Sequence, residues 1–158
     1  MLNKMKEMKN WHPELIPIKR EEDYHTHYIG KTNDGRQFFG YQTFAFPNGY
    51  SMTQDWENHR REYVVIYMFD SKGNYLLTNH EYLGTAKEAK QMDETKILES
   101  MIKDLGQVRF ENIAVKPFKT IIDDIEFGLI EDEEFKGIQL MPSSTIAFFE
   151  PWDGEYDT

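Results

Sequence analysis

Two histidines placed two residues apart have the most suggestive spacing for chemistry in this sequence. His25 and His27 flank Thr26 in a stretch that predicts a β-strand. Residues two apart on a strand point to one face, so both imidazoles could reach a single metal ion. A third ligand would have to come from His59, His80, Glu81 or the acidic C-terminal loops. Because two ligands do not make a site, we predict that these histidines are exposed or satisfied in the core, without a tight metal site.

Other catalytic signatures are missing. The paired carboxylates Glu21-Glu22-Asp23 and Asp123-Asp124 could perform acid–base chemistry, but we expect both to be solvated turns that titrate normally. Ser143-Ser144 lacks the strand-to-helix elbow of a Gly-x-Ser-x-Gly nucleophile, and there is no glycine-rich phosphate-binding loop. The absence of cysteine excludes a thiolate nucleophile and a cysteine-based zinc site. We expect a non-enzymatic protein without a cofactor.

The net charge of −10 comes entirely from the last 37 residues. Acids balance Lys plus Arg over 1–79 and over 80–121, whereas 122–158 hold 11 acids and one base, Lys136. A field of this sign repels phosphate backbones and attracts basic surfaces. We therefore expect a basic protein partner and no direct contact with nucleic acid. The alternative is that the acidic segments only keep the protein soluble.

The candidate partner site combines an acidic run with the aromatic residues of the tail. The run consists of Glu131, Asp132, Glu133 and Glu134, and the tail contains Trp152 and Tyr156. Trp and Tyr are enriched among binding hot spots, so we predict that the acids steer the partner while Trp152 or Tyr156 anchors it. The alternative is a C-terminal strand whose Trp152 packs on the core.

The histidine pair begins a predicted β-hairpin. Runs of aromatic and β-branched residues at 24–29 and 36–46 are separated by Asn33-Asp34-Gly35, a strong hairpin signal. A two-residue turn pairs His27 with Gln42, whereas a three-residue turn pairs His27 with Tyr41. The sequence leaves both registers open.

A second hairpin is expected around the most apolar segment. Residues 63–69 are apolar on both alternating faces, which is typical of a strand covered on both sides, so they are the best candidate for the sheet centre. A turn at 71–74 then leads into a strand at 75–83.

One long amphipathic helix is predicted over about 85–105. Thr85 and Glu88 have the spacing of a capping box, and Gly106 stands where a left-handed C-terminal glycine belongs. The apolar residues at helical spacing are Ala89, Met92, Leu98, Met101, Ile102 and Leu105. We expect this stripe to cover the sheet.

The strand pattern returns at 108–118, 125–130, 137–141 and 145–149. The sequence thus predicts a single α+β domain over 1–158, with a mainly antiparallel sheet of about six to eight strands and the helix packed on it. Residues 1–12 are expected to be a flexible N-terminal extension. The mean hydropathy of −0.70 and the lack of a long apolar run exclude a membrane span, and the absence of cysteine fits the cytoplasm.

Several short segments resemble a known group of proteins. They are Ile16-Pro17-Ile18-Lys19-Arg20-Glu21-Glu22, Tyr28-Ile29-Gly30-Lys31-Thr32, Asp34-Gly35, Phe38-Phe39-Gly40 and Phe149-Glu150-Pro151-Trp152-Asp153-Gly154. From about residue 15 onward, the chain resembles small Bacillus-type proteins labelled formate hydrogenlyase regulatory protein. The resemblance implies a small, cytoplasmic, non-enzymatic bacterial protein and carries over no functional residue.

Three functions follow from these observations. The first is an interaction or regulatory protein that engages a basic partner through its acidic C-terminal region, and an immunity protein that neutralises a basic toxin would have the same properties. The second is a metal-binding module or metal-dependent enzyme that uses His25 and His27. The third is a DNA-binding repressor, which is disfavoured because no basic helix or recognition motif is visible.

Overall fold

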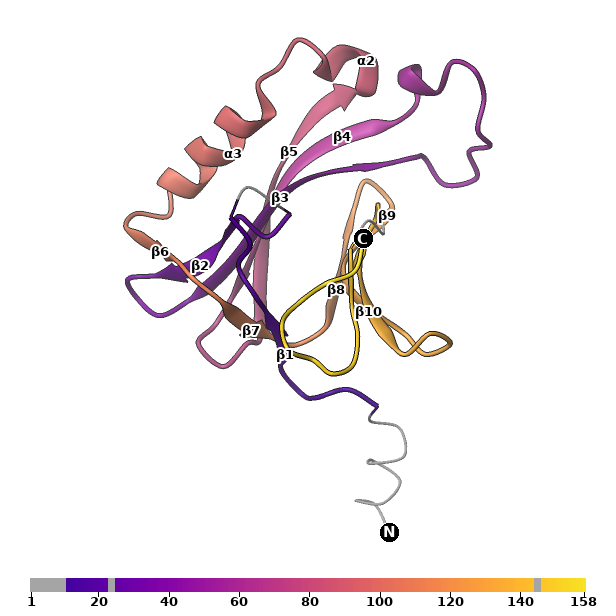
Figure 1. Ribbon diagram of the computed structural model, residues 1–158. Coiled ribbons are helices and arrows are strands. Elements are labelled where there is room, and N and C mark those ends of the chain that lie inside the picture. The colour runs from indigo at the N-terminus through magenta and orange to yellow at the C-terminus, as the bar shows by residue number, and fades with distance from the viewer. Residues whose placement is uncertain (1–10, 23–24, 144–145) are drawn as a thin grey trace.

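The computed structural model describes residues 11–22, 25–143 and 146–158, and within these ranges the chain is mostly antiparallel β-sheet (Figure 1). The strands are β1 (Ile16–Ile18), β2 (Tyr28–Thr32), β3 (Gln37–Ala45), β4 (Arg61–Phe69), β5 (Tyr75–Thr85), β6 (Val108–Phe110), β7 (Ile113–Val115), β8 (Phe118–Ile122), β9 (Ile125–Asp132), β10 (Gly137–Met141) and β11 (Ala147–Phe148). The helical elements are the 3-10 turn η1 (Trp56–Asn58) and the helices α2 (Ala86–Ala89) and α3 (Glu94–Lys103).

The strands form three sheets instead of the single sheet expected. A five-stranded sheet has the order β5-β4-β3-β2-β6, a four-stranded sheet has the order β11-β10-β9-β8, and β1 pairs with β7. Helix α3 covers one face of the five-stranded sheet, and the four-stranded sheet lies on the opposite side (Figure 1). An α+β arrangement dominated by antiparallel sheet is therefore confirmed in outline.

Strand β4 is covered on both faces, as its sequence predicted. Every residue from Tyr63 to Phe69 is fully buried. Val64, Ile66 and Met68 belong to the core under α3, whereas the alternate residues belong to the core shared with the four-stranded sheet. The position differs slightly from the prediction, because β3 occupies the centre of the sheet and β4 lies beside it.

The first hairpin has a three-residue turn. Tyr28 pairs with Gly40, and the backbone N–H of Thr32 donates to the carbonyl of Arg36 at 2.9 Å. Gly35 has a φ of 84°, a left-handed conformation that costs glycine little. The strand begins only at Tyr28, so His27 precedes it.

The prediction of one long helix over 85–105 is wrong. The predicted capping box of Thr85 and Glu88 is present, but α2 ends at Ala89. The Asp93 carboxylate then accepts a hydrogen bond from the Lys96 backbone N–H at 3.1 Å and begins a second helix, α3. A side chain that satisfies a free N–H in this way favours a new helix start over continuation. Met92, expected on the apolar stripe, lies between the helices and is 44% exposed.

The second hairpin and the later strands largely follow the predicted pattern. Strands β4 and β5 are joined by a turn in which the Asp70 carboxylate accepts from the backbone N–H groups of Lys72 and Asn74, both at 2.9 Å. The expected strand over 108–118 is divided among β6, β7 and the start of β8. No helix in the described residues is long and apolar enough to cross a membrane.

Candidate functional site

The acidic run spans the end of β9 and the first half of the turn to β10. One carboxylate oxygen of Asp132 accepts from the backbone N–H groups of Glu134 (3.1 Å) and Phe135 (3.2 Å), and the other accepts from the Gln139 amide (3.2 Å). Asp132 therefore fixes the shape of the turn. Its three neighbours in the run, Glu131, Glu133 and Glu134, are exposed. The four acids thus have different roles: one is structural, and three present charge to solvent.

Phe135 is a residue that the sequence analysis did not single out. It follows the acidic run directly, and its side chain is 67% exposed at the tip of the turn. Aromatic side chains are enriched at protein interfaces, where their area can be buried at small cost in conformational entropy. The available signal was one aromatic residue inside an otherwise charged turn.

A loop of the C-terminal tail lies beside this turn. The Phe149 ring packs so closely on Gly137 that a Cβ added there would stand 2.3 Å from it. Across the same end, the Trp11 ring lies 6.1 Å from the Trp152 ring and 5.6 Å from the Lys136 ammonium. Two further exposed acids, Glu150 and Asp153, belong to this loop. We call the group Glu131, Glu133, Glu134, Phe135, Glu150 and Asp153 the acidic end.

Trp152 and Tyr156, the predicted anchors, are both partly buried and pack against the main core. Trp152 has a φ of 58°, and its backbone N–H donates to the Phe149 carbonyl at 2.9 Å. The Tyr156 ring lies 6.1 Å from Phe148, a fully buried core residue. These contacts favour the alternative in which the tail folds back on the core.

The histidine pair does not lie on a strand. His25 and His27 occupy a turn before β2, so the premise that both side chains share a strand face is wrong. The His25 ring contacts Tyr156, whereas the His27 ring lies against Tyr28 and Phe110. Within the ranges that the structure describes, there is no group of three or more His, Asp or Glu side chains that could hold a metal ion.

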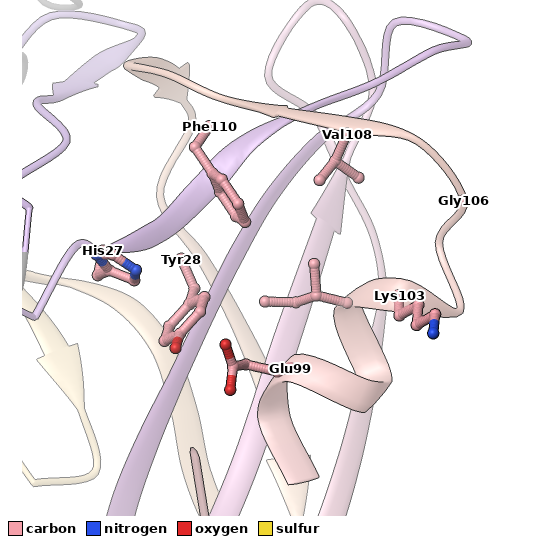
Figure 2. Close-up of a pocket in the computed structure, with 8 residues that line it drawn as sticks. His27, Tyr28, Glu99, Lys103, Gly106, Val108 and Phe110 are labelled. Carbon is pink, nitrogen blue, oxygen red and sulfur yellow. The ribbon is translucent and has the colours of Figure 1, made fainter. Parts of the chain in front are cut away.

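His27 instead lines a pocket of about 220 Å³ between α3 and the strands β2 and β6 (Figure 2). Its lining includes the aromatic rings of Tyr28 and Phe110 and the apolar side chains of Ile102 and Val108. Figure 2 shows Glu99 directed toward Tyr28 and the Lys103 ammonium directed away from the cavity. The pocket therefore offers apolar contact together with the His27 imidazole, the Tyr28 hydroxyl and the Glu99 carboxylate.

Asp123 and Asp124 form the two-residue turn between β8 and β9, with φ values of 52° and 64°. This turn does more than face solvent. The Tyr63 hydroxyl donates to Asp123 Oδ2 at 2.9 Å, and burial together with this carboxylate raises the pKa of Tyr63 to about 12. With Arg61 and Tyr82, the two acids line an open hollow of about 420 Å³.

The other group of adjacent carboxylates, Glu21-Glu22-Asp23, is only partly described. Glu21 is partly buried and Glu22 is exposed, whereas Asp23 lies outside the described residues.

Comparison with known proteins adds no relative. No family model, curated protein or solved structure matches the chain. The resemblance to proteins labelled formate hydrogenlyase regulatory protein therefore stays a prediction. Conclusions about function depend on the surface of this molecule alone.

Proposed function

We propose that this protein is a non-enzymatic interaction protein that engages a basic protein partner through the acidic end. The observation that carries the proposal is Phe135, an aromatic side chain 67% exposed among exposed carboxylates. Charge attracts the partner over distance, and the ring supplies apolar area on contact.

Charge at this end is strongly unbalanced. Five exposed carboxylates belong to the acidic end, and Lys136 is the single Lys or Arg within residues 122–158. Four of these acids, Glu133, Glu134, Glu150 and Asp153, form no ion pair with a described residue, whereas Glu131 lies 3.6 Å from His12 Nε2. Unpaired carboxylates on a fixed turn produce a negative field that raises the association rate of a basic protein.

The anchor in this proposal is Phe135 and not Trp152 or Tyr156. A hot-spot residue must be free to enter a pocket on the partner. Trp152 and Tyr156 already contact the core, whereas most of the Phe135 ring faces solvent. Neutralisation of a basic toxin is one biological role that such a surface would serve.

The test measures binding kinetics of basic proteins captured by the wild-type chain. The triple variant Glu131→Gln/Glu133→Gln/Glu134→Gln leaves Asp132, and so the turn, intact. It should slow association and flatten its salt dependence with little change in dissociation. Phe135→Ala should cost about 2 kcal/mol of binding, a loss of roughly 30-fold in affinity, mostly through faster dissociation.

Matched controls separate this effect from nonspecific loss of charge or apolar area. Glu99→Gln/Asp104→Asn/Asp124→Asn removes the same charge from exposed acids elsewhere, and Ile121→Ala truncates another exposed apolar residue. Both controls should bind as wild type does. The proposal fails if the controls weaken binding as much as the acidic-end variants, or if neither acidic-end variant changes the kinetics of any captured basic protein.

A further inference from the structure

Strand β5 has a long unpaired edge. It spans 11 residues and hydrogen-bonds to β4 along one side only. Its other side pairs with no strand among the residues that the structure describes. Such an edge presents a row of free backbone donors and acceptors, which is a template for another strand.

The edge lacks three of the features by which proteins block strand addition. These three features are short length, Lys or Arg side chains, and proline. Strand β6, at the opposite edge of the same sheet, has three residues and carries Arg109. Strand β8, an edge of the four-stranded sheet, has five residues and carries Lys119. The longer β5 contains neither a basic residue of this kind nor proline.

The middle of β5 is regular and partly apolar. Pairing with β4 runs without interruption from Met68–Leu77 to Tyr63–Tyr82, and irregularities occur only outside this segment. Leu77 is 42% exposed and Tyr82 is 48% exposed, so both faces of the strand present apolar area. The segment 77–82 therefore combines regular pairing with exposed apolar side chains, which favours addition of a partner strand.

We propose that β5 pairs antiparallel with β5 of a second copy of this chain, with the two His80 residues opposite each other. This register places Thr78 opposite Tyr82 and Asn79 opposite Glu81, each pair occurring twice, and all of these residues lie within the regular segment 77–82. Thr–aromatic pairs stabilise cross-strand contacts, and the Asn79 amide can donate a hydrogen bond to the Glu81 carboxylate. A register centred on Asn79 would instead place Glu81 opposite Leu77. The self-complementary sequence thus selects a second copy as the occupant.

Net charge opposes this association. Two of the excess acids, Asp123 and Asp124, line a hollow together with Tyr82 of β5, and Glu81 lies on the strand itself. At physiological salt, charge repulsion is screened over about 8 Å. Added salt should therefore strengthen the dimer, whereas it should weaken binding of a basic partner. The inference does not depend on the proposed function, and the two fail separately.

Sedimentation equilibrium of the full chain over a concentration series gives the first test. The wild type should pass from 18.8 kDa toward twice that mass as concentration rises. Leu77→Lys places on the edge a lysine that has no carboxylate opposite it, and it should raise the dissociation constant at least tenfold. Asn79→Lys places Lys opposite Glu81 of the second copy and should lower it severalfold. Phe135→Lys, which adds the same charge at the acidic end, should change it less than twofold.

Single-cysteine crosslinking tests the register, because the chain contains no cysteine. Opposite residues of antiparallel strands have Cα atoms about 4.5–5.5 Å apart, within the range for a disulfide. His80→Cys should therefore oxidise rapidly to a covalent dimer, whereas Phe135→Cys should not. Thermal melts confirm that each variant is folded. A monomer at every concentration, equal crosslinking of the two cysteine variants, or weakening by Asn79→Lys would overturn the proposal.

Discussion

Two buried tyrosine hydroxyls join the sheets and make a quantitative test of this packing. Tyr41 on β3 and Tyr67 on β4 have their hydroxyl oxygens 2.7 Å apart, and the Tyr41 hydroxyl donates to the Met141 carbonyl at 3.1 Å. Because each hydroxyl has one proton, Tyr67 donates to Tyr41, which donates onward to β10. Burial raises the pKa of both tyrosines, so both are neutral donors.

Removing the Tyr41 hydroxyl should lower the free energy of unfolding more than removing the Tyr67 hydroxyl. Tyr41→Phe removes two hydrogen bonds and leaves the Tyr67 hydroxyl buried without its acceptor, at a cost of about 3 kcal/mol. Tyr67→Phe removes one hydrogen bond while Tyr41 keeps Met141, at a cost of about 1 kcal/mol. The double variant removes both bonds but leaves no orphan hydroxyl, so its cost should be about 2 kcal/mol, less than the sum of the single costs.

Urea unfolding of the three variants, with unchanged slope against denaturant, measures these free energies. For a domain of this size, each kcal/mol should lower the melting temperature by about 2–4 °C. Equal costs for Tyr41→Phe and Tyr67→Phe, or a double variant whose cost equals the sum of the single costs, would refute the hydrogen-bond direction and the chain of contacts derived from it.

Three further predictions concern the tail, the helices and acid stability. Trp152→Ala should lower the free energy of unfolding by about 2 kcal/mol, below the 3–5 expected for a fully buried Trp, and an unchanged denaturation midpoint would contradict its core contacts. Asp93→Ala should cost about 1 kcal/mol through loss of the α3 cap, whereas Met92→Ala should cost much less in the same unfolding experiment; equal costs would favour one continuous helix. Hydrogen bonds from Asn74 and Lys72 lower the pKa of Asp70 in the folded protein. The ionised Asp70 carboxylate therefore stabilises the fold above the pKa that Asp70 has in the unfolded chain, and this stabilisation is lost as the pH falls through the lower pKa of the folded protein. Asp70→Asn should therefore lose less stability than wild type between about pH 5 and pH 3, and NMR titration should place the Asp70 pKa below 3.8.

Local signals in the sequence were sufficient for much of the secondary structure. The burial of Tyr63–Phe69 on both faces followed from an apolar pattern without alternation, and the capping box at Thr85 and Glu88 followed from spacing alone. Such features depend on neighbours within a few residues. The prediction of one long helix was wrong because it also used local signals alone. The apolar stripe correctly indicated the burial of Leu98 and Ile102, but the cap at Asp93 begins a second helix.

The candidate site was predicted only in part. Charge follows directly from residue type, so the sequence alone located the acidic run and the excess of acids over Lys and Arg in the last 37 residues. Which acid is structural could not be read from the run, because Asp132 acquires its role from hydrogen bonds to the turn and to Gln139. Exposure also depends on what packs against a residue, which is why Trp152 was a candidate anchor and Phe135 was not.

The sequence by itself determined the antiparallel character, the capping box and the concentration of negative charge in the last 37 residues. Each of these follows from residue type and short-range spacing. Only the tertiary structure decided the division into three sheets, the turn before β2 that separates His25 from a strand face, and the unpaired edge of β5. Those features depend on which segments meet across the fold, and the free energy of such contacts is set by residues far apart in the chain.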